Sequence, residues 1–358
     1  MSVFGSDGES NSRLTQRPGC LVTAATAVGT LALLAIVLGL FGLWSYFGPG
    51  PAARETDIVL RRASGVAGMA AELKRRRVIG SALLFRAAAE FTGADRKLKA
   101  GEYEFPRGIS LHTVLQMIAS GQVVRHFVTL PEGRTSAQAV AMLRADPILT
   151  GDVITPPEGA LLPDTYEVTR GEPREMVVSQ MRAARDAVLA QLWTHRASDL
   201  PFTRPQDAVT LASIVEKETA LAAERPKVAA VYVNRLRKGM KLDADPTTLY
   251  GISHGEPLGR GLKQSELTAA TPYNTYVVAG LPPTPIANPG RASLEAVFRP
   301  ARTSDLYFVA NGAGGSSFSA TYEEHVKNVA HWRQMESAAA NRKAGCAASP
   351  ASSPHRGC

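Results

Sequence analysis

The sequence has few cysteines and, over one long stretch, no charge. Three cysteines occur in 358 residues, at positions 20, 346 and 358, and all lie outside the segments expected to fold. No disulfide framework is therefore expected, and cysteine catalysis lacks a nucleophile. Residues 21–47 contain no Asp, Glu, Lys, Arg or His. An uncharged apolar run of this length is sufficient to span a bilayer.

The motifs of several enzyme classes are also missing. No Ser or Cys occupies a nucleophile-elbow motif, and the seven histidines lack the spacing of a zinc-binding HExxH helix. There is no nucleotide-binding loop and no RNA-binding aromatic motif. No metal, no cofactor and no nucleic-acid partner is expected. The net charge of +8 suits an anionic partner such as phospholipid or an acidic cell-wall polymer.

The uncharged run predicts the placement of the chain. We expect residues 1–20 to be a short cytoplasmic N-terminus, 21–47 a single transmembrane helix and 48–54 a linker. A cleavable signal peptide is the alternative, although its apolar region is usually shorter. Arginines flank the run on both sides, so the charge pattern does not decide the orientation. Because most of the chain follows the run, we place the residues after it on the periplasmic side of the inner membrane.

Two folded units are expected after the linker. The first, residues 55–122, is a small α+β module. Its predicted elements are a strand at 57–60, helices at 67–77 and 81–91, a strand around Tyr103 and Phe105, and a helix at 111–119. The second, residues 123–335, is a larger α+β domain. Its predicted elements are a strand at 123–133, helices at 137–143, 174–193, 206–222 and 227–237, loops over 241–300, a strand at 305–312 and a helix at 320–335. Residues 336–358 are expected to be a disordered tail.

The stretch LASIVEKETA, residues 211–220, places a carboxylate in an unusual position. On a helix, Glu218 lies at the centre of the apolar face formed by Leu211, Ile214, Val215 and Ala222. Burial there should raise the pKa of Glu218, as a general acid requires near neutral pH. Alternatively, Glu218 pairs with a buried Arg or Lys, or the helix edge is exposed. Glu216 points the other way and is expected to be a surface charge.

Five segments in order carry a family resemblance: ASIVEKET, ERPKVAAVYVNRLRKGM, DPTTLYG, TPYNTY and GLPPTPIANPG. They resemble the signature blocks of the endolytic murein transglycosylases, the YceG-like or MltG family, over about residues 123–327. The first unit is similar to a LysM-type glycan-binding module. The resemblance implies a transmembrane helix, a LysM-like module and an α+β catalytic domain.

The resemblance also implies a reaction. Such enzymes cleave the β-1,4 bond between N-acetylmuramic acid and N-acetylglucosamine within nascent glycan strands, leaving 1,6-anhydro ends and terminating strand elongation. The second Glu of the family's EKET motif, Glu218 here, is the catalytic residue. The implied partners are peptidoglycan strands and, as a further hypothesis, the penicillin-binding synthases.

The remaining blocks predict substrate contacts. The predicted residues are Asp245, Tyr273, Asn274, Thr275, Tyr276 and Asn288. Each also has a structural interpretation, since Asp-Pro and Pro-Tyr-Asn segments are ordinary in turns. Arg235 could pair with a carboxylate, and Asp243 departs from the usual residue of the family. Two other functions stay open: a non-catalytic peptidoglycan-binding scaffold, and a hydrolase with Asp245 as its second carboxylate.

Overall fold

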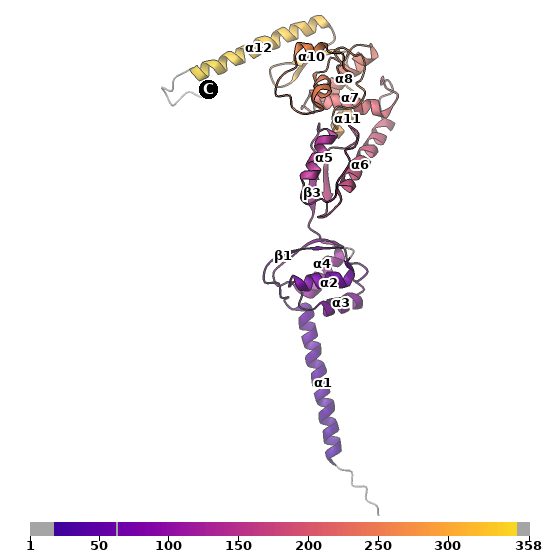
Figure 1. Cartoon of the computed structure of the whole chain (residues 1–358), viewed down its shortest axis with the longest axis vertical. Coiled ribbons are helices and arrows are strands. Elements are labelled where there is room, and N and C mark those ends of the chain that lie inside the picture. Colours follow the sequence, from indigo (N-terminus) through magenta and orange to yellow (C-terminus); the bar gives the residue numbers. More distant parts are fainter. Residues whose placement is uncertain (1–17, 62–63, 349–358) are drawn as a thin grey trace, which may run out of the picture. The chain divides into compact units, whose positions relative to one another are not determined.

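The computed structural model describes residues 18–61 and 64–348. The chain divides into two compact units, one ending at Val124 and the other beginning at Arg125 (Figure 1). The sequence prediction places this boundary two residues earlier, between 122 and 123. Most of the predicted cytoplasmic N-terminus, and residues 349–358 of the predicted tail, lie outside the described residues. The two units are described separately below.

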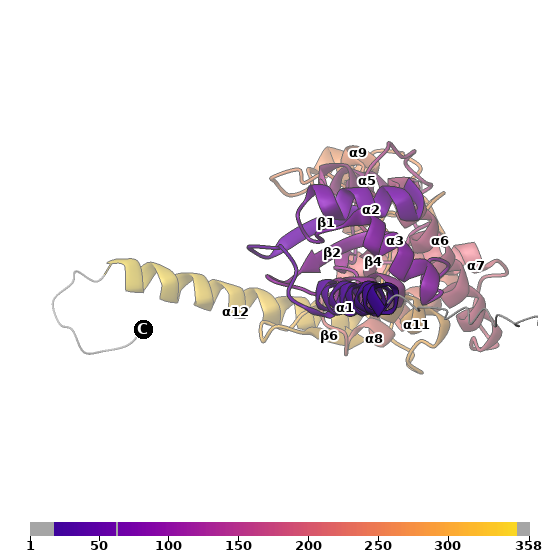
Figure 2. The same ribbon diagram turned by 90° about the horizontal axis from the view of Figure 1, so that it is seen from below.

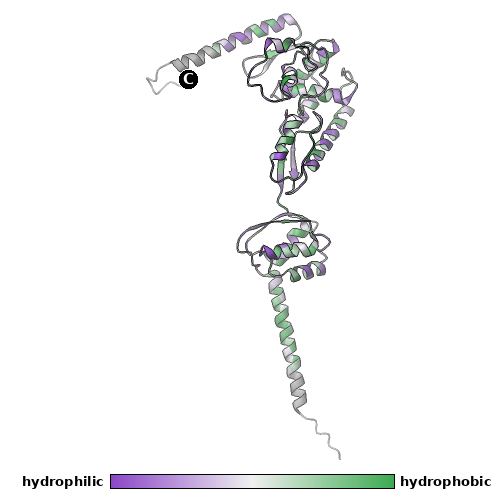
Figure 3. Cartoon of the chain, in the orientation of Figure 1, coloured by the Kyte–Doolittle hydropathy of each residue, from purple (hydrophilic) through white to green (hydrophobic). Residues whose placement is uncertain are grey.

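The first unit begins with an apolar helix, α1 (Pro18–Phe47). Its Thr26–Phe47 portion is long and apolar enough to cross a membrane, and none of the most apolar stretch is buried by other parts of the protein. Figure 3 shows the hydrophobic colour continuing along this part of the helix. A membrane anchor and a signal sequence both have these properties, so the helix is consistent with either.

A small α+β body follows α1. Its elements are β1 (Thr56–Leu60), α2 (Gly65–Arg75), α3 (Ala82–Phe91), β2 (Gly101–Phe105) and α4 (Leu111–Ser120). The two strands pair antiparallel, with Thr56 opposite Phe105. Ser81 and Ser110 cap α3 and α4 by accepting bonds from backbone N–H groups. Gly121 ends α4 in the left-handed conformation that glycine adopts most easily.

The second unit opens with a strand pair packed by two helices. These elements are β3 (His126–Thr129), α5 (Ser136–Ala145), β4 (Thr165–Val168) and α6 (Arg174–Thr194). Strands β3 and β4 pair antiparallel, with His126 opposite Val168. Their inner faces form one apolar core with Leu143, Val177 and Met181 from the helices. The sequence did not predict β4, because its four residues follow a proline-rich segment that favours loops.

Three helices form the centre of the second unit: α7 (Pro205–Glu218), α8 (Arg225–Arg237) and α11 (Arg291–Phe298). They pack on one another around a shared core that includes Leu211, Val228 and Leu294 (Figure 1). Residues 208–215 of α7 are all buried. This helix is therefore surrounded by protein over most of its length, and side chains reach the surface only near its two ends.

The region predicted as loops, 241–300, contains three helices. Besides α11 these are α9 (Asp245–Ser253) and α10 (Gln264–Thr268). The prediction was wrong here because it took the prolines as helix breakers. Pro246 lies in the first turn of α9, where a missing N–H costs nothing and the fixed φ suits a helix.

The second unit ends with a hairpin and a long helix. Strands β5 (Tyr307–Ala310) and β6 (Ser316–Ser319) pair antiparallel, and α12 (Tyr322–Ala348) follows. Figure 2 shows α12 starting beside β6 and extending away from it. The prediction ended this helix at 335, but the alanine-rich segment 336–348 continues it, since alanine is the strongest helix former. The described chain is thus a mostly helical α+β protein with three two-stranded antiparallel sheets.

Candidate active site

Glu218 is the last residue of α7. The sequence prediction continued this helix to residue 222, but Thr219 is extended, with φ −140° and ψ 131°. The hydroxyl of Thr219 accepts a hydrogen bond from the N–H of Leu221, a local turn that competes with further helix. Because α7 ends at this residue, the Glu218 side chain lies at the C-terminus of a helix that is buried over most of its length.

Glu218 faces a cleft of about 360 Å³. We call this the Glu218 cleft. It is lined by Glu218, Tyr232, Arg235, Leu242, Asp243, Asp245, Tyr276, Tyr307, Phe308, Tyr322 and His325. Tyr232, on α8, donates a hydrogen bond from its hydroxyl to Oε1 of Glu218 at 2.7 Å. Because Tyr232 is itself buried, this bond holds the carboxyl group in one orientation.

The surroundings of Glu218 favour its protonated form. Burial raises its pKa to about 7, and the negative charge of Asp245 acts in the same direction. The bond from Tyr232 and the positive charge of Arg235 oppose this rise but do not cancel it. A carboxyl group with this pKa is partly protonated at neutral pH, so it can give a proton to a leaving oxygen.

Asp245 and Tyr276 form a second polar pair in the cleft. Asp245 is the first residue of α9, and its Oδ1 accepts a hydrogen bond from the Tyr276 hydroxyl at 2.7 Å. Burial and this bond together raise the pKa of Tyr276, so the phenol stays protonated and keeps donating. Two of the residues predicted to contact substrate therefore share a cleft with the predicted acid.

Arg235 holds the walls of the cleft together. Its Nε donates to the carbonyl of Leu306 at 2.7 Å, and its Nη1 donates to the carbonyl of Leu242 at 2.9 Å. Nη1 also lies 2.9 Å from Oδ2 of Asp243. The predicted pairing of Arg235 with a carboxylate is thus present. Asp243 has a φ of 50°, a conformation that a non-glycine residue adopts only with local support, which Arg235 supplies.

Asn274 and Thr275 are fully buried, and their polar atoms are used inside the protein. Nδ2 of Asn274 donates to the carbonyl of Ala269 at 2.7 Å, and its Oδ1 accepts from the hydroxyl of Thr248. The Thr275 hydroxyl accepts from the N–H of Ala244 at 3.0 Å. Both residues fix the loop that carries Tyr276 against α9. They present no surface to a glycan in this structure.

Asn288 and Tyr273 also lie away from the cleft lining. Asn288 is fully buried; its Oδ1 accepts from the N–H of Leu161 at 2.9 Å, and its Nδ2 donates to the carbonyl of Arg134 at 3.0 Å. The Tyr273 hydroxyl bonds to Thr284, and its ring packs on Tyr250. The sequence predicted both residues as substrate contacts, but here Asn288 bonds only within the protein, because a buried amide side chain can satisfy backbone groups of loops. The Tyr273 hydroxyl is exposed, but it lies outside the Glu218 cleft.

Glu216 is not the surface charge that the helical pattern predicted. Its side chain is only 5% exposed, and Oε1 lies 3.1 Å from Nη2 of Arg225. Its Oε2 accepts a bond from the N–H of Gly290 at 2.9 Å, and Arg225 also pairs with Glu132. The prediction was wrong because α11 and the loop before it cover the face of α7 that local periodicity assigned to solvent.

Several cleft residues were not predicted. Tyr232 could have been found, since it precedes Arg235 by three positions on one face of the same helix. Tyr307, Phe308, Tyr322 and His325 come from β5 and α12, and no local motif marks them. Among residues 18–61 and 64–348, no three His, Cys, Asp or Glu side chains come together in a group that could hold a metal ion.

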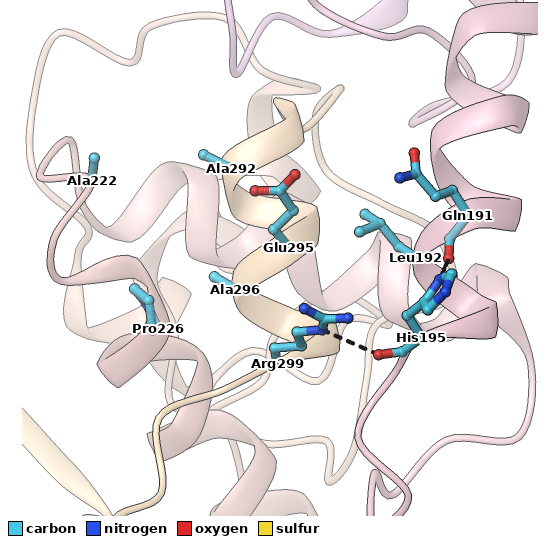
Figure 4. A pocket seen from close by; sticks show the side chains of 9 residues that line it. All are labelled: Gln191, Leu192, His195, Ala222, Pro226, Ala292, Glu295, Ala296 and Arg299. Carbon is cyan, nitrogen blue, oxygen red and sulfur yellow. Dashed lines mark hydrogen bonds between the residues drawn. The ribbon is translucent and has the colours of Figure 1, made fainter.

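A wider cleft of about 640 Å³ lies between α6, α8 and α11 (Figure 4). Its polar groups already have partners within the protein. Nε of Arg299 donates to the carbonyl of His195 at 3.1 Å, and Glu295 pairs with Arg291 at 3.6 Å. The carboxylate of this cleft is thus paired with an arginine, and volume alone does not make the cleft the candidate site.

Comparison of the sequence with known proteins gives a family match. The sequence profile of the YceG-like family matches residues 58–331. The chain is 30% identical over 305 residues to the endolytic murein transglycosylase of Bacillus subtilis, covering 76% of this chain and 83% of that protein. It is 27% identical to the endolytic murein transglycosylase of Streptococcus pneumoniae strain D39, covering 75% of this chain and 56% of that protein. A crystal structure of a YceG-like protein from Listeria monocytogenes is 28% identical, with a TM-score of 0.47, and covers 76% of this chain and 98% of that one.

Proposed function

Because the chain belongs to the YceG-like family, we propose that it is a lytic transglycosylase that cuts peptidoglycan glycan strands internally. The relatives named endolytic murein transglycosylase supply the substrate class. The observation that carries the proposal is the state of Glu218: a carboxyl group that faces a cleft, has a pKa of about 7 and is oriented by Tyr232.

In the first step, protonated Glu218 gives its proton to the glycosidic oxygen between N-acetylmuramic acid and N-acetylglucosamine. The bond from that oxygen to the anomeric carbon breaks, and the N-acetylglucosamine end leaves as an alcohol. Positive charge develops on the muramic acid ring. The Glu218 carboxylate formed here is stabilised by the hydrogen bond from Tyr232.

In the second step, the 6-hydroxyl of the same muramic acid attacks its anomeric carbon. Glu218, now ionised, accepts the hydroxyl proton and returns to its starting state, and the product is a 1,6-anhydro ring. The reaction consumes no water and needs one carboxyl group. Holding the 6-hydroxyl close to the anomeric carbon favours this intramolecular attack over attack by water.

Hydrolysis is the second candidate, because Asp245 lines the same cleft. A hydrolase needs a second carboxylate as base or nucleophile. Asp245 already accepts a bond from Tyr276, an arrangement that suits a positioning group better than a base. The chemical form of the new sugar end distinguishes the two reactions, since hydrolysis leaves a reducing end.

The test is mass spectrometry of peptidoglycan digested by the full chain in detergent, beside its Glu218→Gln variant. Wild type should release 1,6-anhydro ends, and the variant should be slower by roughly 10²–10⁴-fold, the usual contribution of a general acid. Reducing ends would indicate a hydrolase. If neither protein cuts and both bind glycan, the scaffold function replaces this proposal. The rate constant kcat/KM of the wild type should fall as pH rises above about 7, where Glu218 loses its proton.

We also propose where the protein lies in the cell and which part of the chain binds glycan. Helix α1 is the membrane anchor, and the catalytic unit lies on the periplasmic side, where new strands are made. The order β1, α2, α3, β2 supports assigning glycan binding to the LysM-like first unit. An intact mass that includes residues 1–47 in the membrane fraction is expected, whereas a mature protein lacking them would make α1 a signal sequence.

A further inference from the structure

Three aromatic rings form one wall of the Glu218 cleft. Tyr307 comes from β5, and Tyr322 and His325 come from the first turns of α12. The rings of Tyr307 and His325 are stacked, with centroids 5.1 Å apart and an interplanar angle of 22°. The ring of Tyr322 lies 5.8 Å from that of Tyr307. The wall therefore places a stacked pair of rings and the exposed ring of Tyr322 beside the candidate acid.

Packing of α12 on the hairpin does not explain this wall. Tyr322 is 65% exposed, whereas Tyr232, which packs on Phe308 in the same cleft, is 2% exposed. An aromatic ring that serves only to attach a helix is usually buried. Tyr307 is held from another direction by Arg235, whose guanidinium carbon lies 5.2 Å from the ring centroid. Tyr307 is thus held between Arg235 and His325, whereas the ring of Tyr322 is open to solvent.

His325 adds a polar group without a partner. Its Nδ1 is buried and has no hydrogen-bond partner in the described chain. Burial lowers the pKa of His325, and the positive charge of Arg235 lowers it further, so the ring is neutral at pH 7. A neutral imidazole has one donor and one acceptor nitrogen. Since Nδ1 is buried, Nε2 is the atom that can bond to a hydroxyl or an amide in the cleft, without placing a second cation beside Arg235.

We propose that Tyr307, Tyr322 and His325 form a sugar-binding platform that holds one N-acetylhexosamine ring of the glycan strand next to Glu218. A pyranose ring has an apolar C–H face, which packs on aromatic rings, and an edge of hydroxyl and acetamido groups, which bond to His325. The platform recognises the sugar chain and not the peptide stem. The identity of the sugar rests on the proposed function, but the existence of the binding site does not.

The test uses the full chain in detergent and compares four substitutions. Tyr322→Ala and His325→Ala remove parts of the platform, and His325→Gln keeps a donor and an acceptor. Val326→Ala changes an exposed neighbour on α12 outside the cleft lining and serves as the control. For each protein, kcat and KM on uncrosslinked glycan strands are measured. Binding of a chitin tetramer is measured by calorimetry in the Glu218→Gln background.

The Tyr322→Ala and His325→Ala variants should raise KM and the tetramer Kd by roughly two- to tenfold, the size expected for one aromatic contact. Their kcat should change less, His325→Gln should recover part of the binding, and Val326→Ala should match wild type. Unchanged KM and Kd in Tyr322→Ala, a substitution at an exposed position, would overturn the platform. A loss of kcat alone in both variants would also contradict it.

The same measurements distinguish failure of the proposed lytic activity from failure of the sugar-binding platform. If wild type does not cut glycan but binds the tetramer in a way that depends on Tyr322, the platform stands and the lytic activity does not. If wild type produces 1,6-anhydro ends with a KM that is the same in all four variants, the activity stands and the platform does not. Peptide stems that compete with the tetramer for wild type would also contradict the platform.

Discussion

Two carboxylates of the same segment, Glu216 and Glu218, have opposite environments. Glu216 contacts the guanidinium of Arg225 and the N–H of Gly290, and its side chain is 5% exposed. Glu218, two residues later, accepts a hydrogen bond from a neutral phenol and faces a cleft. The first has a cationic partner that offsets its charge, whereas the second forms no ion pair with any residue that the structure describes.

This difference separates a structural from a chemical role. A buried carboxylate with an ion-pair partner and a backbone donor joins the elements that supply them, in this case α7, α8 and the start of α11. Burial raises the pKa of both carboxyl groups, but at Glu216 the N–H of Gly290 and the charge of Arg225 oppose the rise. Glu218 also opens on a cleft, where a proton can pass to a ligand. The comparison can be tested by substituting Glu216, and then Glu218 and its partner Tyr232, in separate variants.

The largest effect on stability is expected from Glu216→Ala. The substitution leaves Arg225 buried with Glu132 alone, and breaking a buried ion pair in this way typically costs about 3–5 kcal/mol. The free energy of unfolding is measured by urea denaturation of the full chain in detergent. The matched control is Glu323→Ala, which removes a carboxylate from the exposed pair with Lys327 and should cost about 0–1 kcal/mol. Equal losses in the two variants would contradict a structural role for Glu216.

An intermediate effect is expected for the pH dependence of stability. The pKa of Glu218 is about 7 in the folded state and ordinarily 4.5, so the folded protein keeps a proton that the unfolded chain loses between these values. Stability from this group is therefore present below pH 4.5 and is lost as pH rises to 7. Relative to wild type, Glu218→Gln should gain about 1–3 kcal/mol of stability between pH 4.5 and pH 8. If the difference in unfolding free energy between the two proteins does not change with pH, the pKa of Glu218 is not raised.

The smallest effect is expected from Tyr232→Phe. Its hydrogen bond lowers the pKa of Glu218, so its removal should raise that pKa further. The alkaline limb of kcat/KM should move to higher pH by about 0.5–1 unit, since a hydrogen bond is worth about 0.5–1.5 kcal/mol. Tyr250→Phe is the control, because its hydroxyl contacts Glu158 outside the Glu218 cleft. A shift of the same size in both variants would show that the effect is not local.

Sequence patterns predicted the small first body well. Its strands and helices each lie within a few residues of the expected positions. Short-range signals suffice there because each element is amphipathic and bounded by its own capping or turn residue. The resemblance to a family also located Glu218, Asp245 and Tyr276, which share one cleft. The roles of the other motif residues could not be derived in this way, because a buried and an exposed asparagine look alike in a sequence.

By itself, the sequence determined the apolar N-terminal helix, the α+β class and the family, and it predicted Glu218 as the candidate acid. Only the tertiary structure decided that α7 stops at Glu218, that the Glu216 side chain is buried, and that Tyr232 and His325 line one cleft with Glu218. Periodicity and motifs report contacts within one or two helical turns. Burial, charge pairing and pKa depend on segments far apart in the chain, such as α7, α8, β5 and α12, which only the folded protein brings together.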